Sequence, residues 1–322
     1  MIRLSIIILL FSFSSCSHFI GRDCIIKKGA FDIGSGSTKA IFATINKCEG
    51  KIVEVLFEKQ SPLKFKASLR YNSSQIPQSL RKKATKVLSQ WKAKGLELGV
   101  TQFTAVATEV FRQATNGGRF IKKLSKDTGI PIKIITQEDE ALIGFWAGVA
   151  NAKQSPEDVL VWDIGGGSMQ MSHINDKGQI DYYLGKIASV SFKKRISGNM
   201  TPNPLLPVGS KQAAIKARNL AQIDVPQEFI KSIQEKEVIG IGGVHYHSLG
   251  KKLDYLSYDQ KQLREKMLAS SYLTDKEIGG SYSATDVTNM ALVLGFMEGL
   301  DIKRVTPVNV NLAHGLLLAP LN

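Results

Sequence analysis

The stretch that decides the fold is residues 160–171, which read LVWDIGGGSMQM. An apolar run ends in Asp163 and is followed by three glycines and a serine. Residues 30–39, AFDIGSGSTK, repeat this arrangement with Asp32 in the equivalent position. Each copy predicts a buried strand that ends in an acid and then turns through a loop with exposed backbone N–H groups, because glycine has no Cβ to cover them. The repeat therefore predicts two related halves.

The two loops predict a site for phosphate. Successive backbone N–H groups in a glycine turn form an anion-binding concavity, and the serine hydroxyls add donors. The aspartates repel phosphate, but they suit a divalent cation, or water bound to one, beside the phosphate. Two such loops facing each other across a cleft would bind one phosphoanhydride from both sides. The alternative is that each loop is only a tight hairpin turn, and the second copy of the pattern argues against it.

Length and composition indicate a globular protein with room for two domains. The chain has 322 residues, of which 43% are hydrophobic and 22% charged, which is unlike a disordered protein. Lys and Arg number 42 against 28 Asp and Glu, a formal net charge of +14. Such a surplus attracts polyanions, among them polyphosphate, nucleotides and nucleic acid, although it can also serve solubility alone.

Residues 1–17 predict a signal peptide. Arg3 precedes an apolar stretch followed by small residues, and this stretch is shorter than the roughly 20 residues of a membrane-spanning helix. Cys16 follows two serines, as in a bacterial lipoprotein, although Phe13 stands where leucine is usual. The alternatives are lipidation of Cys16 and ordinary cleavage near Ser17. Either one predicts an exported protein, in the bacterial periplasm or anchored by lipid to a membrane.

The other two cysteines, Cys24 and Cys48, are expected to form a disulfide. They lie in predicted strands on either side of the turn GSGS, and a hairpin centred on Gly36 pairs residues whose numbers sum to 72, as 24 and 48 do. Cross-strand partners have Cα atoms about 4.5–5.5 Å apart, which a disulfide accepts. An exported chain favours the bridge. The alternative is two unrelated buried thiols.

Strands and helices alternate along the chain, which predicts an α/β fold with mixed sheets. In the first half we expect strands at 25–33, 38–45, 51–59, 103–108 and 131–136, and helices at 79–97, 116–127 and 138–150. In the second half we expect strands at 159–164 and 237–243, a hairpin after the first of them, a connecting loop at 194–210 and a helix at 284–300.

The chain resembles the exopolyphosphatase/guanosine-pentaphosphate phosphatase (Ppx/GppA) family of the actin-like ATPase superfold. The resemblance rests on the segments FDIGSGSTK (31–39), VATEVFRQATNG (106–117), IITQEDEALIGF (134–145), VWDIGGGSMQ (161–170), IASVSF (187–192), IGIGG (239–243) and NLAHG (311–315), in family order. It implies two duplicated actin-like (ribonuclease H-like) domains, with mixed sheets flanked by helices and a cleft between the domains. Residues 22–139 with 310–322 would form domain I, and residues 140–309 domain II.

The resemblance also implies a role for each site residue. The terminal phosphates would be bound by Gly34, Ser35, Gly36, Ser37, Arg112, Gly165, Gly166, Gly167, Ser168, Gly242 and Gly243. Asp32 and Asp163 would hold Mg²⁺, partly through water. Glu140 would orient and deprotonate the attacking water. Residue type alone does not choose among the acids at 138, 139 and 140, and the register of the family motif selects Glu140.

Several positions depart from the family pattern. Gln170 stands where the family usually has a glutamate that helps hold the metal. Exported nucleoside di- and triphosphatases, the apyrases, use glutamine at the corresponding place to position the attacking water, so Gln170 is expected to act in catalysis. Other departures are Leu142, Gly36, Asn309, Asn311 and His314. These changes bear on the choice of substrate rather than on the fold.

The expected function is an exported, exopolyphosphatase-like phosphoanhydride hydrolase that uses Mg²⁺ and water to release terminal phosphate from polyphosphate. One alternative is an exported nucleoside tri- or diphosphatase, and another is a non-catalytic relative that binds polyphosphate or nucleotide. No nucleic acid partner is expected, and contact with a membrane is expected only through the lipid anchor. A homodimer is an open alternative to a monomer.

Overall fold

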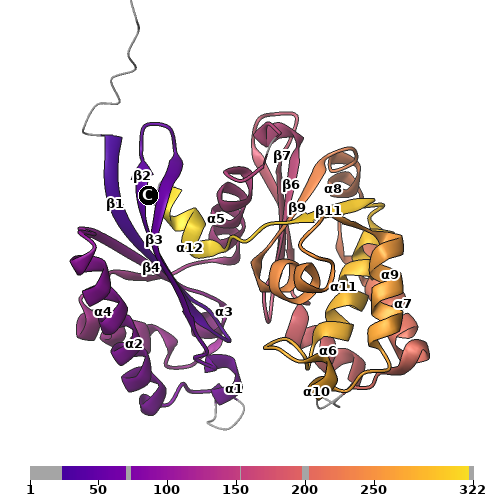
Figure 1. Cartoon of the computed structure of the whole chain (residues 1–322), viewed down its shortest axis with the longest axis horizontal. Coiled ribbons are helices and arrows are strands. Elements are labelled where there is room, and N and C mark those ends of the chain that lie inside the picture. The colour runs from indigo at the N-terminus through magenta and orange to yellow at the C-terminus, as the bar shows by residue number, and fades with distance from the viewer. Residues whose placement is uncertain (1–23, 70–73, 153, 198–202, 319–322) are drawn as a thin grey trace, which may run out of the picture.

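The computed structural model describes residues 24–69, 74–152, 154–197 and 203–318 (Figure 1). The signal peptide predicted at residues 1–17 and the lipidation predicted at Cys16 lie outside the described residues. Among the helices of the described ranges, none has the length and apolar character needed to cross a membrane.

The first half of the chain forms a five-stranded mixed sheet with the order β3-β2-β1-β4-β5. Its strands are β1 (Ile25–Ile33), β2 (Thr38–Asn46), β3 (Lys51–Ser61), β4 (Gln102–Ala107) and β5 (Ile132–Ile134). The first three strands are antiparallel, whereas β1, β4 and β5 run parallel. The acid that ends β1 therefore lies at the same edge of the sheet as the end of β4.

Alternate side chains of β1 enter different cores on the two faces of this sheet. Phe31 packs in the cluster that includes residues of α2 (Gln78–Glu97) and α4 (Gly117–Thr128). Its neighbour Ala30 packs in the cluster of α12 (Leu312–Leu318) on the other face. The C-terminal helix α12 thus packs on the first sheet, although it follows the second sheet in the sequence.

The second half forms a six-stranded mixed sheet with the order β10-β11-β9-β6-β7-β8. Its strands are β6 (Val159–Ile164), β7 (Met169–Ile174), β8 (Ile180–Gly185), β9 (Glu237–Ile241), β10 (Tyr258–Asp259) and β11 (Arg304–Pro307). As in the first half, three antiparallel strands, β6, β7 and β8, are joined to parallel strands. β6 pairs in parallel with β9, and β9 pairs in parallel with β11. The predicted α/β fold with two mixed sheets flanked by helices is confirmed.

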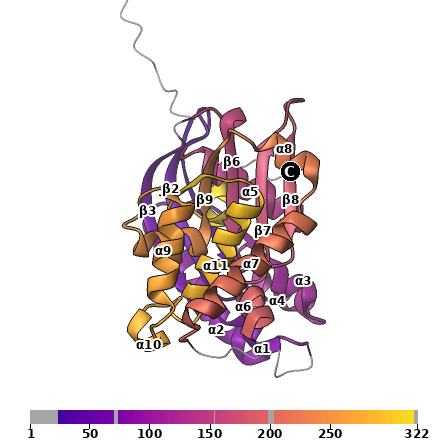
Figure 2. The same ribbon diagram turned by 90° about the vertical axis from the view of Figure 1, so that its right-hand side faces the viewer.

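Helices cover both faces of the second sheet. On one face, α7 (Leu206–Asp224), α9 (Gln260–Ser270) and α11 (Asp286–Gly299) pack together over the sheet (Figure 2). The opposite face carries α5 (Gln137–Val149), whose Phe145 and Ala147 are buried against the strands. The remaining helices are α1 (Phe65–Leu69), α3 (Glu109–Gln113), α6 (Ser189–Ser197), α8 (Gln227–Ser232) and α10 (Asp275–Ile278), with the short turns η2 (Pro156–Asp158), η3 (Val244–Leu249) and η4 (Gly250–Lys252).

Two helices join the halves between the sheets. α5 packs on the second sheet, α12 packs on the first, and the two helices contact each other (Figure 1). Gly315 makes this close approach possible, because a Cβ there would overlap the carbonyl oxygen of Ile143. The expected boundary between residues 139 and 140 falls in the first turn of α5. The division into residues 22–139 with 310–322 and residues 140–309 stays a prediction.

The expected connecting loop at residues 194–210 is shorter than predicted. α6 continues to Ser197, and α7 begins at Leu206. Pro207, which falls within the predicted loop, lies in the first turn of α7. Proline is tolerated there because its missing N–H would have no partner inside the helix.

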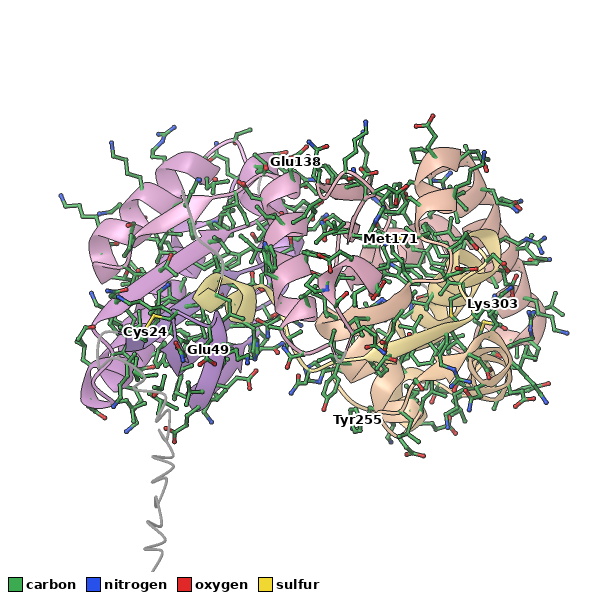
Figure 3. All side chains as sticks on the ribbon, turned by 90° about the horizontal axis from the view of Figure 1, so that it is seen from above. Cys24, Glu49, Glu138, Met171, Tyr255 and Lys303 are labelled. Carbon is green, nitrogen blue, oxygen red and sulfur yellow. A yellow bond between two sulfur atoms is a disulfide. The ribbon has the colours of Figure 1, made fainter. Side chains whose placement is uncertain are left out.

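The structure joins Cys24 and Cys48 by a disulfide, with Cα atoms 5.4 Å apart (Figure 3). The hairpin register that suggested this pair is wrong by one residue. Asp32 faces Lys39 and Ile25 faces Asn46, so paired numbers sum to 71 rather than 72. The carbonyl of Cys24 therefore accepts a backbone hydrogen bond from Lys47, and the disulfide reaches the residue after Lys47, just beyond the end of β2.

Candidate active site

The two glycine turns that follow the strand-ending acids, residues 32–37 and 163–168, are called the Asp-Gly turns below. They have the same backbone geometry. The N–H of Gly34 donates to the carbonyl of Ser37 at 3.0 Å, and the N–H of Gly165 donates to that of Ser168 at 2.9 Å. The cross-strand partners of the aspartates also correspond. Asp32 pairs with the residue seven positions later, Lys39, and Asp163 with the residue seven positions later, Gln170. The duplication therefore extends to the register of each hairpin.

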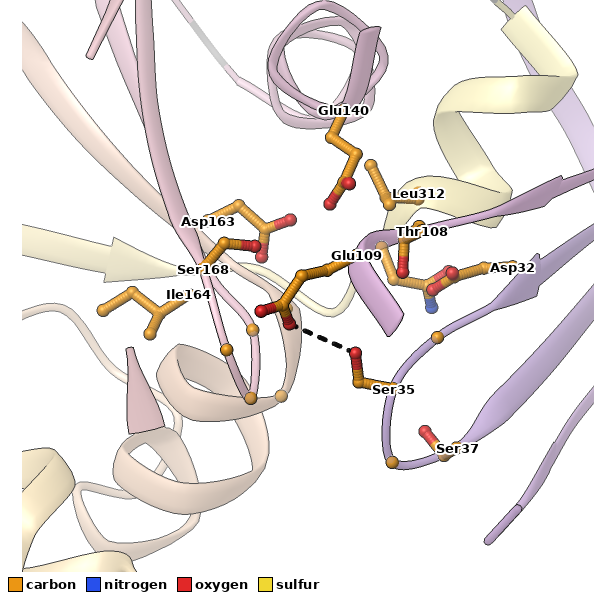
Figure 4. Close-up of a pocket in the computed structure, with 18 of the residues that line it drawn as sticks. Asp32, Ser35, Ser37, Thr108, Glu109, Glu140, Asp163, Ile164, Ser168 and Leu312 are labelled. Atoms are coloured by element: carbon orange, nitrogen blue, oxygen red, sulfur yellow. Dashed lines mark hydrogen bonds between the residues drawn. The ribbon is translucent and has the colours of Figure 1, made fainter. Parts of the chain in front are cut away.

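Both turns line one cavity of about 100 Å³ between the halves (Figure 4). The cavity is lined by Asp32, Gly34, Ser35, Gly36, Ser37, Lys39, Thr108, Glu109, Glu140, Asp163, Ile164, Gly165, Gly166, Gly167, Ser168, Gln170, Gly242, Gly243, Asn311 and Leu312. These include every predicted site residue of the cleft except Arg112. A phosphorylated ligand in the cavity would contact both turns, as the sequence pattern requires.

The first aspartate is paired with a lysine. Lys39 Nζ lies 3.3 Å from Asp32 Oδ2, and the other carboxylate oxygen, Oδ1, is buried without a hydrogen-bond partner among the described residues. Burial opposes the charge of Lys39, but the carboxylates of Asp32 and Asp163 and the Tyr282 hydroxyl outweigh it and raise the lysine pKa. The cleft thus holds a lysine cation beside Asp32, and the charge of this cation also acts on Asp163.

The second aspartate has no cation on its own strand pair. Burial raises the pKa of Asp163 to about 6, Lys39 lowers it and Asp32 raises it. Gly242 lies against this carboxylate, because a Cβ there would overlap Asp163 Oδ1, and its φ of +80° also favours glycine. The turn after β9 therefore lies against the Asp163 carboxylate.

Among the three acids at the start of α5, the structure places only Glu140 in the cavity. Glu138 is exposed at the surface (Figure 3). Asp139 accepts from the backbone N–H of Thr136, while its own N–H donates to the Thr136 hydroxyl in a capping box. Glu140 points into the cavity near Asp163 (Figure 4).

Glu140 is held by Arg112. The guanidinium donates to Glu140 Oε1 at 2.6 Å and also to the carbonyl of Ile135. Burial raises the pKa of Glu140 to about 8, against the lowering effect of Arg112 and its hydrogen bond, and Asp32 and Asp163 raise it further. Arg112 does not line the cavity here, so it positions Glu140, and its contact with phosphate stays a prediction.

Gln170 lies in the cavity beside the second turn. Its side chain is 3% exposed, and Nε2 lies 3.3 Å from the hydroxyl oxygen of Ser168. Neither group carries charge, so the second hairpin supplies a neutral amide where the first supplies Lys39.

Sequence reasoning missed several cavity residues. Lys39 could have been found, because it stands at the same place in DIGSGSTK as Gln170 in DIGGGSMQ. Glu109 had no such signal, since its approach to the two turns depends on how α3 is placed against the second half. Thr108 enters with α3 and Leu312 with α12, whereas Asn311, which precedes α12, was named above only as a departure from the family pattern.

The donor set fits Mg²⁺ with few protein ligands. The described residues contain no group of three or more His, Cys, Asp or Glu arranged to hold a metal ion. Mg²⁺, however, usually binds through one or two carboxylates and completes its shell with water and substrate phosphate. The unpartnered Oδ1 of Asp32 and the partly buried carboxylate of Asp163 meet that requirement. Any ion would share Asp32 with Lys39.

Known proteins share both the sequence pattern and the fold. A model of the Ppx/GppA phosphatase family matches residues 43–202, about half of the chain. A bifunctional 3-dehydroquinate synthase/phosphatase of Fusobacterium nucleatum is 26% identical over 270 residues, 80% of this chain. The match covers 38% of that relative, so the chain spans well under half its length.

Solved structures match over nearly the whole chain. The Ppx/GppA family member of Aquifex aeolicus has a TM-score of 0.75 and 18% identity, covering 91% of this chain and 97% of its own. An exopolyphosphatase of Cytophaga hutchinsonii has a TM-score of 0.72 and 18% identity, covering 90% and 96% respectively. At this identity the likeness shows the fold.

The duplicated fold and the facing turns define the two-domain, actin-like architecture that the Ppx/GppA structures share. The chain belongs to the Ppx/GppA phosphatase family, as its sequence segments predict. Members of this family are phosphatases that hydrolyse phosphoanhydride bonds.

Proposed function

We propose that this protein releases terminal phosphate from inorganic polyphosphate as an exopolyphosphatase-like hydrolase. The observation that carries the proposal is that both Asp-Gly turns and Glu140 line one cavity. A terminal phosphate between the turns would accept hydrogen bonds from backbone N–H groups on both sides. The net charge of +14 supports a long polyanion as the substrate.

The residues divide the reaction between them. Glu140 orients the attacking water and accepts its proton, as the water oxygen bonds to phosphorus and the bridging P–O bond breaks. Gln170 helps to position that water. When bound, Mg²⁺ held by Asp32 and Asp163 would neutralise phosphate charge. Lys39 adds a fixed positive charge in the same place.

An exported nucleoside tri- or diphosphatase is the second candidate. It is favoured by Gln170, which stands where the family usually has a glutamate and where apyrases have glutamine. A relative that binds polyphosphate or nucleotide without hydrolysis is the third. The three candidates share the cavity and differ in which phosphate compounds are bound and cleaved.

Export to the periplasm or to a lipid anchor on a membrane is part of the proposal. Residues 1–17, with Cys16, carry the signal for it. The disulfide between Cys24 and Cys48 supports it, because such bridges persist mainly in oxidising compartments.

Phosphate release from polyphosphate and from ATP, with and without Mg²⁺, tests the proposal. Glu140→Gln keeps the shape of the side chain but removes the base, so the rate should fall about 100- to 10,000-fold. Glu138→Gln is the matched control, because Glu138 is exposed on the same helix turn and should leave the rate unchanged.

Three results would change the assignment. Equal rates for the wild type and Glu140→Gln would contradict hydrolysis by this site. Cleavage of ATP in preference to polyphosphate would select the nucleotidase. Binding of polyphosphate without any phosphate release would select the non-catalytic relative.

A further inference from the structure

A further carboxylate, besides those of Asp32, Glu140 and Asp163, lies where the two Asp-Gly turns meet. Glu109, the first residue of α3, projects into the space between the turns (Figure 4). Ser35 Oγ of the first turn donates to Glu109 Oε2 at 3.3 Å. On the other side, a Cβ added to Gly167 of the second turn would overlap the same oxygen. One carboxylate oxygen therefore touches both turns.

Glu109 is held there by residues of its own half. Lys66 Nζ of α1 lies 2.5 Å from Oε1, and Gln113 Nε2 donates to that oxygen at 2.8 Å. The Glu109 side chain is 13% exposed and Lys66 is 28% exposed, so the pair is partly shielded from water. An interaction of this kind is worth more than a fully exposed ion pair.

A carboxylate oxygen in this place imitates a phosphate oxygen. It is an anion that accepts a hydroxyl hydrogen bond from one glycine-rich turn and lies against the other. A substrate phosphate between the turns would meet Glu109 as a like charge at short distance, which is unfavourable. Glu109 and a bound phosphate therefore compete for one position and for one cation, Lys66.

We propose that Glu109 occupies the phosphate position in the free protein, and that phosphate binding displaces it and transfers Lys66 to the substrate. This inference rests on the proposed phosphoanhydride hydrolase function and adds an affinity-determining residue to it. Return of Glu109 to the turns after the reaction then favours release of product phosphate.

Lys66 also lines a neighbouring cavity of about 410 Å³. It is lined by Lys66, Leu69, Ser74, Gln113, Val190, Ser191 and Lys194. Lys66 and Gln113 thus touch this cavity and also bind Glu109. With Glu109 displaced, Lys66 stands between the turns and a second lysine, Lys194, which suits a ligand with more than one phosphate.

Direct binding of methylenediphosphonate tests the proposal without hydrolysis. In this compound a methylene group replaces the bridging oxygen of pyrophosphate, so there is no P–O–P bond to cleave. Glu109→Gln keeps the side-chain shape and removes the competing charge. The dissociation constant of this variant for methylenediphosphonate, measured by calorimetry, should be about tenfold lower than that of the wild type. Tenfold is the size of effect expected from one charged hydrogen-bonding group. Lys66→Gln should weaken binding by a similar factor.

Glu97→Gln is the matched control. Glu97 also forms an ion pair with a lysine, Lys94 at 3.0 Å, but it lies exposed at the end of α2 and outside both cavities. It should leave the dissociation constant unchanged. Unchanged or weaker binding by Glu109→Gln would overturn the proposal, as would tighter binding by Glu97→Gln of the same size.

Turnover provides an independent readout. Where phosphate is released, Glu109→Gln should lower KM and make inorganic phosphate a stronger product inhibitor. If the wild type hydrolyses no phosphoanhydride but binding responds to Glu109 as expected, the hydrolase function fails and the competition stands. If hydrolysis is found and neither KM nor binding responds, the competition fails alone.

Discussion

The two Asp-Gly turns share one backbone design and differ in the side chain opposite the acid. In the first turn, Lys39 faces Asp32 and forms an ion pair with it. In the second, Gln170 faces Asp163, whose pKa burial raises to about 6. The two hairpins thus share the backbone that we propose binds phosphate, and they differ in the side chains opposite the acids. The first hairpin carries the fixed positive charge, and the second carries the amide beside the proposed water.

The largest effect on this comparison is expected from the turn after β9. Gly242→Ala should lower kcat/KM about 100-fold, because its Cβ overlaps the Asp163 carboxylate and small displacements of this kind are costly. Its φ of +80° also strains the substituted chain. Steady-state phosphate release measures the effect. Gly118→Ala in α4 is the control, since a Cβ there meets nothing within 4 Å, the residue lies outside the cavity, and the rate should stay within about twofold.

Making the two hairpins alike should have the next largest effect. In the wild type, Lys39 pairs with Asp32 and lowers the pKa of Asp163. Lys39→Gln removes this cation. The kcat/KM should fall about 10- to 100-fold, the range of one charged hydrogen bond. The Asp163 pKa should also rise, because burial then acts with less opposition, and a pH profile of kcat/KM would show this. A variant as active as the wild type would mean that the two hairpins are electrostatically equivalent.

The pH dependence sharpens the comparison, because Glu140 faces both aspartates. Burial raises its pKa to about 8, so at neutral pH the base is mostly protonated. The kcat/KM should therefore rise about tenfold per pH unit below 8 and level off above it. Arg112→Gln removes the cation that lowers this pKa, so the profile should move to higher pH. The interval from about pH 6 to about pH 9 brackets the Glu140 pKa of about 8. A flat profile of kcat/KM across this interval would exclude Glu140 as the base.

The smallest effect on activity is expected at the far end of the first hairpin. The disulfide joins Cys24 and Cys48 where β1 begins, and the turn lies where β1 ends. The described second hairpin, β6 with β7, contains no cysteine. Cys24→Ser with Cys48→Ser should cost about 3 kcal/mol of unfolding free energy, measured with denaturant, and leave kcat/KM unchanged. A loss of activity in the folded variant would show that the hairpin transmits strain to its turn.

Most of the fold and much of the site could be predicted from local patterns. Helix α2 was expected at 79–97 and is found at Gln78–Glu97, because its apolar face repeats with helical spacing. The facing of the turns followed from the repeat. The hairpin register failed by one residue, because a glycine-rich turn does not fix its own centre. The ion pair between Arg112 and Glu140 could not be predicted, because the sequence does not show how far apart these two side chains lie.

By itself, the sequence determined the two strands that end in acid, the glycine turns that follow them and the family to which the chain belongs. These features are local, since they depend on hydrophobic runs and on residues without Cβ. Only the tertiary structure decided that Arg112 binds Glu140 and that Glu109 touches both turns. Those contacts join segments distant in the sequence, and their distances depend on how the helices and sheets pack against one another.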